Sequence, residues 1–272
     1  MLYVCAVCTW ESDVELPKCK NCGNEGTLEI SGFRPLDDVD ANDIERVSVG
    51  IPAFDRVLGG GLVPGSVVLL GGLPGLGKST LLTQVAKEVA DQGKIVTYVS
   101  AEESLGQMRL RANRLIGAGK MPKSLLVDDI TDLKLILQRF DVVKPDLAII
   151  DSVQAINHPA LRSSTGSPGM VRGCAERLLA WGKRHKTPVI LVCHVNKNGK
   201  MAGPQTLAHM VDVTMYLEPS KRFKAQRRLF ADKNRFGSTT EEAMFAMGFS
   251  GLVEFGGVTE NNPQGGLVFK ED

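Results

Sequence analysis

The strongest chemical signal in the sequence is a glycine-rich segment that ends in lysine and serine. It reads Gly72-Leu73-Pro74-Gly75-Leu76-Gly77-Lys78-Ser79, which has the spacing G-x-x-x-x-G-K-[ST]. Glycines let the main-chain N–H groups of such a loop point at phosphate oxygens, and a following helix adds its positive N-terminal end. We expect Lys78 to reach the β- and γ-phosphates of ATP and Ser79 to bind Mg²⁺. The predicted nucleotide-binding residues are Gly72, Pro74, Gly75, Gly77, Lys78, Ser79 and Thr80.

Two carboxylates occupy positions that suit the hydrolysis of ATP, one as a ligand of Mg²⁺ and the other as a general base. Asp151 ends the apolar run Leu147–Ile150, and a carboxylate at the end of such a buried strand can bind Mg²⁺ directly or through water. Glu102 follows the predicted strand Ile95–Val99, and ligands gather at this edge of open α/β sheets. We predict that Glu102 is the base that orients the attacking water. Asp151 could instead be a polar strand end, and Glu102 with Glu103 could cap a helix.

Four cysteines lie within the first 22 residues as two C-x-x-C pairs separated by ten residues. Two such turns can present four thiolates, which suits a tetrahedral structural Zn²⁺. So short a module cannot bury enough apolar surface to fold unaided, and the metal would supply folding free energy. An iron–sulfur cluster or disulfides are the alternatives. The predicted zinc ligands are Cys5, Cys8, Cys19 and Cys22, whereas Cys174 and Cys193 are predicted to be packed core thiols.

Apolar runs alternate with helical patterns from Val47 onward, which is typical of an α/β fold with a mostly parallel sheet. The glycine-rich loop lies between a predicted strand, Val67–Leu70, and a predicted helix, Leu81–Asp91. This setting argues against a chance match to the motif. Short strands and hairpins are expected from Thr214 onward. The remaining predicted elements are strands Ser124–Val127 and Val189–Val192 and helices Leu133–Phe140 and Arg172–His185.

Length and composition limit the possible classes of protein. A chain of 272 residues can hold one large domain and a small module. We predict a four-cysteine module over residues 1–30, a linker over residues 31–46 and an ATPase domain over residues 47–272. The 32 basic residues nearly balance the 31 acidic ones, so nucleic-acid binding would require local patches. No apolar run approaches the roughly 18 residues that span a membrane, and no signal-peptide pattern is present, so a cytoplasmic protein is expected.

Several segments together resemble bacterial RadA, also called Sms, a family of RecA-like recombination ATPases. They include Asp55–Gly65, Tyr98–Ser104 and His194–Lys197, and the resemblance runs almost end to end. The most specific segment is Lys233-Asn234-Arg235-Phe236-Gly237, because this motif distinguishes RadA from the recombinase RecA. The resemblance implies a RecA-like P-loop core that uses ATP and Mg²⁺. It further implies a homo-hexameric ring that moves along single-stranded DNA as a helicase and drives branch migration in homologous recombination and DNA repair.

The resemblance also assigns roles to individual residues. Lys78 and Ser79 match the phosphate and Mg²⁺ ligands of the family. Glu102 matches the water-activating glutamate of RecA-like ATPases, and His194 ends its strand where such proteins sense the γ-phosphate. Lys233 and Arg235 match residues that act near ATP at the subunit interface and on DNA. Recombinase filaments are a candidate partner.

Basic segments are the candidates for DNA contact. A positive loop after the strand Val189–Val192 could follow phosphates, and a Ser- and Gly-rich segment, Arg162–Gly169, is a second candidate. A run beginning at Lys221 is also positive, although it could be a solvated hairpin tip. Each loop could equally be an ordinary surface segment. Lys233 and Arg235 alternate along a predicted strand and would face one side. The predicted DNA-binding residues are Arg172, Lys197, Lys200, Lys233 and Arg235.

Two features depart from the family pattern. Family members usually continue into a C-terminal Lon-protease-like domain, whereas this sequence stops at Asp272, so we expect a chain without that domain. Leu16-Pro17-Lys18 stands where an aromatic–glycine pair commonly precedes the second cysteine pair. The competing interpretations are a replicative-helicase-type motor and a RecA-fold ATPase that works as a nucleotide-regulated interaction or signalling module without recombination activity.

Overall fold

The chain divides into two compact units, Met1–Ile44 and Glu45–Asp272. The computed structural model describes residues 2–31, 45–116, 119–194, 206–220 and 225–255, so most of the predicted linker lies outside the described residues. The smaller unit contains a three-stranded antiparallel sheet in the order β2-β1-β3. Its strands are β1 (Leu2–Cys5), β2 (Glu11–Ser12) and β3 (Leu28–Ser31).

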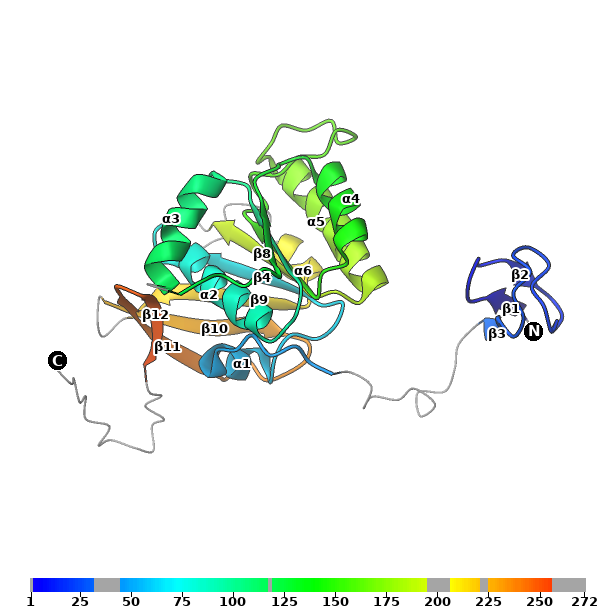
Figure 1. The fold of residues 1–272 in the computed structure, drawn as a ribbon, viewed down its shortest axis with the longest axis horizontal. Coiled ribbons are helices and arrows are strands. Elements are labelled where there is room, and N and C mark those ends of the chain that lie inside the picture. The colour runs from blue at the N-terminus through cyan, green and yellow to red at the C-terminus, as the bar shows by residue number, and fades with distance from the viewer. Residues whose placement is uncertain (1, 32–44, 117–118, 195–205, 221–224, 256–272) are drawn as a thin grey trace. The chain divides into compact units, whose positions relative to one another are not determined.

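In the described residues of the larger unit, nine strands form one sheet in the order β12-β11-β10-β9-β4-β8-β7-β5-β6 (Figure 1). The neighbours from β9 to β6 are parallel, and β9 to β12 pair antiparallel. The predicted mostly parallel sheet is therefore confirmed. The strands are β4 (Val67–Gly72), β5 (Val96–Ser100), β6 (Leu125–Asp128), β7 (Leu147–Asp151), β8 (Val189–His194), β9 (Val213–Pro219), β10 (Gln226–Asn234), β11 (Glu242–Gly248) and β12 (Gly251–Phe255).

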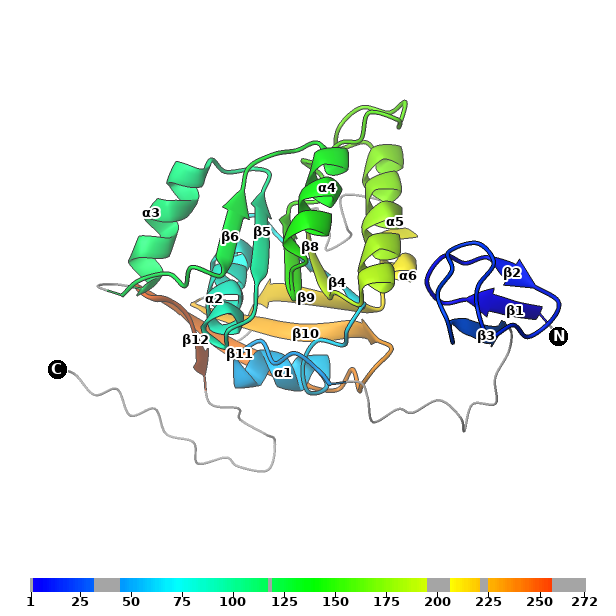
Figure 2. The same ribbon diagram turned by 45° about the vertical axis from the view of Figure 1, so that its right-hand side comes forward.

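Alternate side chains of the central strands pack into two separate cores. In β4, Val68 and Leu70 join the first core, whereas Val67 and Leu69 join the second. Every β4 residue is buried, as expected for a parallel strand covered on both faces. Helices α1 and α2 pack on the first face, and α4 and α5 cover the second (Figure 2). The helices are α1 (Pro52–Leu58), α2 (Lys78–Asp91), α3 (Leu105–Ile116), α4 (Leu133–Val143), α5 (Pro168–His185) and α6 (Thr206–Met210).

Capping explains where α5 begins. The Ser167 hydroxyl accepts a hydrogen bond from the Met170 N–H at 3.3 Å, and Pro168 occupies the first turn. Serine as N-cap and proline just inside it are favourable because the first N–H groups of a helix have no partner within the helix. The helix therefore begins at Pro168 rather than at the predicted Arg172. The Ser- and Gly-rich segment consequently ends in the first turn of α5.

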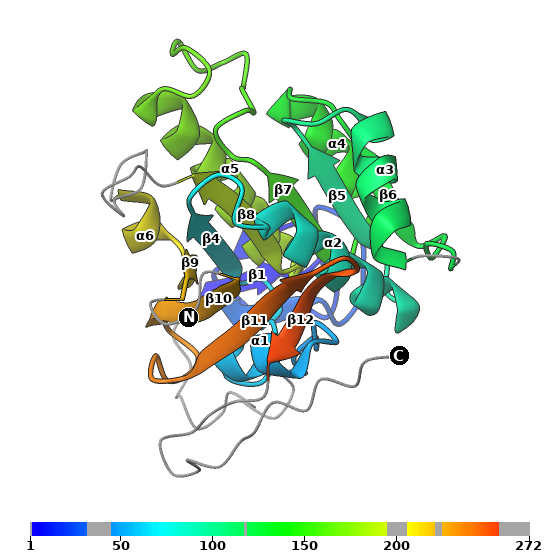
Figure 3. The same cartoon turned by 90° about the vertical axis from the view of Figure 1, so that its left-hand side faces the viewer.

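The β11–β12 hairpin packs against α2, as Figure 3 shows from the side of these strands. Gln84 of α2 makes two hydrogen bonds with Leu252 of β12. Its amide donates to the Leu252 carbonyl at 2.9 Å, and its carbonyl accepts from the Leu252 N–H at 3.0 Å. The hairpins predicted after Thr214 thus form part of the main sheet and support the helix that follows the glycine-rich loop. Across the described residues, no helix combines the length and the apolar character needed to cross a membrane.

Candidate functional site

The predicted phosphate loop connects the end of β4 to the start of α2, at the carboxyl edge of the parallel strands. Gly75 and Gly77 have φ angles of 77° and 99°, a region that favours glycine. A Cβ atom on Gly77 would lie 2.5 Å from the Met247 side chain of β11, whereas one on Gly75 would meet nothing within 4 Å. The loop is therefore closed on the side of the hairpin and open at Gly75, where phosphate oxygens could approach.

Lys78 is buried although it carries a charge. Its Nζ donates to the carbonyl oxygen of Gly72 at 2.8 Å and to that of Leu73 at 3.0 Å. Burial lowers the pKa of the Lys78 ammonium group, and the carboxylates of Asp151 and Glu102 act in the opposite direction. The ammonium group is thus held by the carbonyls of its own loop, where phosphate oxygens would be stronger partners.

Asp151 lies at the end of β7 and is 6% exposed. The hydroxyl group of Tyr98 in β5 donates to its Oδ2 atom at 2.7 Å. That hydrogen bond fixes one carboxylate oxygen while the other remains available as a ligand. Ser79 and Asp151 offer hydroxyl and carboxylate oxygens, which Mg²⁺ prefers. The donor types therefore fit Mg²⁺ bound together with a nucleotide.

Glu102 and His194 meet across the carboxyl edge of the sheet. Glu102 follows β5, His194 ends β8, and β7 lies between these strands. The Nε2 atom of His194 lies 2.9 Å from Oε1 and 3.0 Å from Oε2 of Glu102, and the Ser152 hydroxyl also donates to Oε1. The hydrogen bond with His194, followed by that with Ser152, lowers the pKa of Glu102 against the effect of burial. The carboxylate is thus kept ionised, which is the state a general base requires.

Ser152 and Gln154 belong to this site, although no sequence motif identifies them. The Gln154 amide donates to the His194 carbonyl at 3.4 Å, and its carbonyl accepts from the His194 N–H at 3.3 Å. The amide also reaches the Cys193 Sγ atom at 3.1 Å. Gln154 therefore fixes the main chain of His194. The sequence gives one indication of this role, namely that Gln154 comes three residues after Asp151. The role itself follows only from the structure, in which β7 pairs with β8.

Cys174 and Cys193 are fully buried, and burial raises the pKa of each thiol to about 11. A thiol with such a pKa stays protonated and unreactive near neutral pH. The predicted role of both as packed core thiols is confirmed.

Lys233 and Arg235 each have partners within the chain. The Nζ atom of Lys233 donates to the carbonyl oxygens of Ala208, His209 and Val211 at 3.0, 3.1 and 2.6 Å, at the end of α6. Arg235 forms an ion pair with the buried carboxylate of Asp212 at 3.1 Å. Lys197 and Lys200 lie outside the described residues, in the segment that runs from His194 to α6. Lys233 therefore anchors the helix into which that predicted DNA loop leads.

The other residues of the Lys233–Gly237 motif hold a turn. Asn234 donates to the Leu58 carbonyl at 3.1 Å, and its own side-chain oxygen accepts from the Phe236 N–H at 2.9 Å. A Cβ atom on Gly237 would lie 3.1 Å from the Gly59 Cα atom, so only glycine fits there without movement. These residues close the end of α1, whereas the cations of the same motif point to α6 and Asp212. Arg172, another predicted DNA contact, lies exposed on α5 and pairs with Glu176 at 2.8 Å.

The four cysteines of the small unit converge. Their sulfur atoms all lie within 4.8 Å of one another, and both the Cys5–Cys22 and the Cys8–Cys19 sulfur distances are 3.6 Å. A tetrahedral zinc site with Zn–S bonds of about 2.3 Å requires sulfur separations of about 3.8 Å, whereas a disulfide requires about 2.05 Å. Side-chain amides of Asn21 and Asn24 point at the Cys8 and Cys22 sulfurs at 3.4 and 3.5 Å. The arrangement fits a metal held by thiolates, with amide donors behind them.

Metal removal is the first experimental prediction. The purified chain is expected to contain about one Zn²⁺, and a strong chelator is expected to unfold residues 2–31 without melting the larger unit, since each unit packs by itself. Metal analysis and thiol titration would measure the first effect, and amide exchange of the two units the second. A Cys174→Ala variant is the matched control, because this thiol is far from the cluster in the chain and packs in the second core. A metal-free protein with freely titrating thiols and an unchanged small unit would contradict the assignment.

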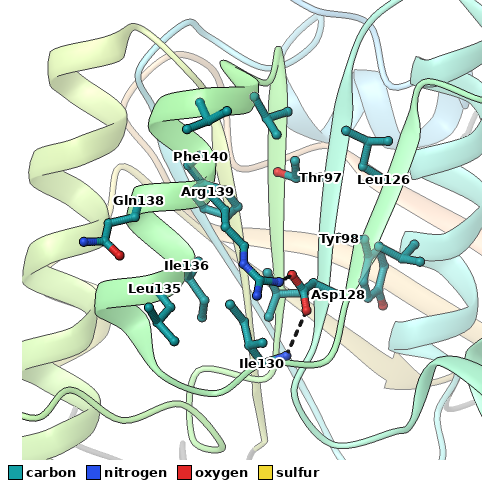
Figure 4. A pocket seen from close by; sticks show the side chains of 14 residues that line it. Thr97, Tyr98, Leu126, Asp128, Ile130, Leu135, Ile136, Gln138, Arg139 and Phe140 are labelled. Carbon is teal, nitrogen blue, oxygen red and sulfur yellow. Dashed lines mark hydrogen bonds and ion pairs between the residues drawn. The ribbon is translucent and has the colours of Figure 1, made fainter.

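A separate cavity of about 380 Å³ lies between β5, β6 and α4 (Figure 4). Its lining is mainly apolar and includes Leu126, Ile136 and Phe140. Arg139 and Asp128 pair with each other at this cavity, and Asp128 also accepts from the Ile130 N–H at 3.3 Å. Because the charged groups neutralise each other, the cavity does not suit a phosphate. The loop between β4 and α2 therefore remains the predicted nucleotide site.

Comparison with known proteins agrees with this geometry. A family model described as AAA domain matches residues 33–200. The chain is 40% identical to the DNA repair protein RadA of Listeria monocytogenes over 95% of this chain and 60% of that protein, and 41% identical to that of Aquifex aeolicus over 93% and 59%. The chain thus spans less than two thirds of the length of these relatives. The resemblance to RadA that its motifs predicted is confirmed. A solved KaiC-like protein from Pyrococcus horikoshii shares the fold, with a TM-score of 0.64 and 20% identity over 78% of this chain and 99% of that chain.

Proposed function

This chain belongs to the AAA-domain family, and we propose that it is an ATP-hydrolysing motor of the RadA type that binds single-stranded DNA. The observation that carries the proposal is the contact between Glu102 and His194. This contact connects the Glu102 carboxylate, at the proposed nucleotide site, to the end of β8. Residues 195–205, which include the predicted DNA-binding lysines, follow β8 in the sequence. The names of the relatives support DNA repair as the process that the hydrolysis serves.

In this proposal, ATP binds with its phosphates in the loop Gly72–Ser79. Lys78 exchanges its carbonyl partners, the oxygens of Gly72 and Leu73, for oxygens of the β- and γ-phosphates. Mg²⁺ held by Ser79 and Asp151 would neutralise charge on the same phosphates. Glu102 accepts a proton from the attacking water and orients that water toward the γ-phosphate.

DNA would act on hydrolysis through the neighbours of Glu102. His194 and Ser152 both bond to the Glu102 carboxylate and set its direction. Phosphates that bind Lys197 and Lys200, close to His194 in the sequence, would change the position of His194 and so that of Glu102. We place Arg172, Lys233 and Arg235 in the same DNA-responsive region. We also assign residues 1–30 to a zinc module, 31–46 to a linker and 47–272 to the ATPase domain.

The proposal extends to the oligomeric state of the protein and to the DNA transactions that ATP hydrolysis drives. We propose a homo-hexameric ring that encircles single-stranded DNA, with helicase activity and branch migration as the outcomes in homologous recombination. A replicative-helicase-type motor and a nucleotide-regulated interaction module are the competing functions. The likeness to the KaiC-like protein does not favour either of them, because it concerns the fold alone.

Equilibrium DNA binding tests the proposal. A fluorescent oligothymidylate should bind the protein in the presence of a non-hydrolysable ATP analogue, and its affinity should fall as salt rises, because phosphate contacts release counterions. Duplex DNA of the same length serves as the comparison. The absence of binding even at low salt would leave an interaction module as the better interpretation.

Lys233→Ala is expected to spare ATP binding and to weaken DNA-stimulated hydrolysis by about tenfold. The change removes a charge-assisted donor from three carbonyls at the end of α6, and such bonds contribute roughly 1.5–3 kcal/mol. Nucleotide affinity and DNA-stimulated turnover should be measured together. Lys134→Ala, which removes an exposed lysine from α4, is the control. Loss of ATP affinity with unchanged DNA affinity would contradict this role for Lys233.

A further inference from the structure

A second cavity, of about 560 Å³, lies at the edge of the sheet opposite the nucleotide site. Its lining includes Lys94, Lys144 and Lys186, which come shortly before the starts of β5, β7 and β8. The phosphate loop lies at the other ends of the parallel strands. Because strands of five or six residues are about 17–20 Å long, this cavity is separate from the nucleotide site.

Hydrogen bonds tie the three lysine-bearing segments into one frame. The Ile95 N–H donates to the Asp146 carboxylate at 2.7 Å, and the Asp146 N–H donates to the Ile95 carbonyl at 2.8 Å. The Thr187 hydroxyl donates to the Pro145 carbonyl at 3.0 Å, and both residues are buried. The backbone next to each lysine is therefore fixed, so the three ammonium groups are presented from a preformed surface.

Lys144 and Lys186 have unusual backbone conformations. They occupy the C-cap positions of α4 and α5 with φ angles of 51° and 54°. Glycine or asparagine normally fills such left-handed positions, because a larger side chain costs on the order of 1 kcal/mol or more there. Lysine nevertheless occupies this strained backbone position at the ends of both helices, next to one cavity. A function of the two lysine side chains would explain why glycine or asparagine is not found there.

The simplest structural explanation is that these lysines neutralise the carbonyl ends of their helices. Lys233 is an example of that role, because its ammonium group donates to the carbonyls of Ala208 and His209 in α6 and of Val211 just after it. Within the part of the chain that the structure describes, the ammonium groups of Lys94, Lys144 and Lys186 have no hydrogen-bond or ion-pair partner. They are therefore available to a ligand.

The remaining charged groups leave the cavity net positive. Arg46 lines it as well, but its guanidinium group donates to the carbonyls of Phe236 and Leu58. Asp146 accepts a main-chain N–H, and Glu45 is the other carboxylate of the lining. His185 pairs with Asp141 at 3.4 Å and stacks on Trp181. Three lysines thus face the cavity with no ion-pair partner of their own.

We propose that this cavity binds the phosphate backbone of nucleic acid, as a contact separate from the DNA loops at the carboxyl edge. Lysine ammonium groups are point charges on flexible stems, which suits phosphates in varied positions. The described lining contains no Phe, Tyr or Trp on which a base could stack, and its surface is more polar than apolar, which suits a phosphate backbone better than an acidic peptide with apolar side chains. Binding is therefore independent of base sequence and strongly dependent on salt. This inference rests on the proposed DNA-binding function.

The test compares two double variants that each lose two positive charges. Lys144→Asn with Lys186→Asn removes two cavity lysines, and asparagine accepts a left-handed φ, so the fold should be kept. Lys120→Asn with Lys123→Asn is the control, because both lysines are exposed and neither lines the cavity. Binding of labelled oligothymidylate is measured over a range of NaCl concentrations. Thermal melting checks that both variants are folded.

The cavity variant should bind oligothymidylate about tenfold more weakly, and the slope of log affinity against log salt should fall by about 1.4, which is two contacts at roughly 0.7 each. The control should stay close to wild type. Equal behaviour of the two variants would overturn this inference alone, whereas a wild-type chain that binds no DNA would overturn the proposed function as well. A polyglutamate peptide that depends on the cavity lysines, with DNA binding unchanged, would assign the cavity to acidic peptides and reject the inference.

Discussion

Lys78→Ala is expected to reduce ATP turnover by about a thousandfold, which is the scale of losing a charged group that stabilises the transferring phosphoryl group. The ammonium group of Lys78 is the one cation described within the phosphate loop, and it is buried against the oxygens of Gly72 and Leu73. Alanine removes this charge and leaves the two carbonyls facing the bound phosphates. Nucleotide affinity should fall as well, because the proposed mechanism uses this ammonium group both in binding and in hydrolysis.

Steady-state phosphate release and binding of a fluorescent ATP analogue would measure the two effects. Lys87→Ala is the matched control, because Lys87 lies on the same helix but pairs with Asp91 at 2.6 Å on its outer surface. That variant should hydrolyse ATP at close to the wild-type rate. Near-normal turnover in Lys78→Ala would show that the loop between β4 and α2 is not the catalytic nucleotide site.

Glu102→Gln should lower the turnover number by about two to four orders of magnitude while ATP binding is retained, which is the range expected for a general base. Glutamine keeps the size of the side chain and its bonding to His194 and Ser152, but it cannot accept a proton from water. The neighbouring Glu103→Gln is the control, because Glu103 forms an ion pair with Arg111. Equal effects of the two substitutions would contradict the assignment of the base.

The pH dependence of hydrolysis follows from the same contact. The hydrogen bond with His194 lowers the pKa of Glu102, so the carboxylate stays ionised at pH values where an ordinary glutamate would be protonated. The interaction is present above the ordinary pKa of glutamate and is lost as pH falls through the lowered one. His194→Ala should therefore move the acidic limb of the rate profile to higher pH. An unmoved limb would mean that another group controls it.

Local sequence patterns were sufficient to predict the strand, loop and helix around Gly72–Ser79 and the central strands of the sheet. Glycines spaced as they are before Lys78 are typical of a loop between a strand and a helix that binds phosphate. Apolar runs such as Leu147–Ile150 are typical of buried parallel strands. The helices α1 and α3 were not predicted. Helix α1 has only seven residues, which is too short to establish a helical repeat, and α3 is largely exposed.

The contacts of the candidate site could not be predicted in the same way. Glu102, Ser152 and His194 come from three strand ends, and their meeting depends on the order β8-β7-β5 within the sheet. The partners of Lys233 likewise depend on where α6 lies, which no spacing in the sequence gives. Single motifs therefore predict which chemistry is available, whereas the pairing of distant strands decides which residues carry it out together.

ATP turnover measured with and without single-stranded DNA tests the central claim most directly, namely that the site at Gly72–Ser79 drives a DNA-dependent motor. The measurement uses the whole chain, with Mg²⁺ and saturating ATP, and with Lys78→Ala to subtract contaminating activity. We expect slow turnover by the free protein and a several-fold rise when oligothymidylate is added, and we expect this rise to be lost as salt weakens the phosphate contacts. A turnover rate that is the same with and without bound DNA would contradict it.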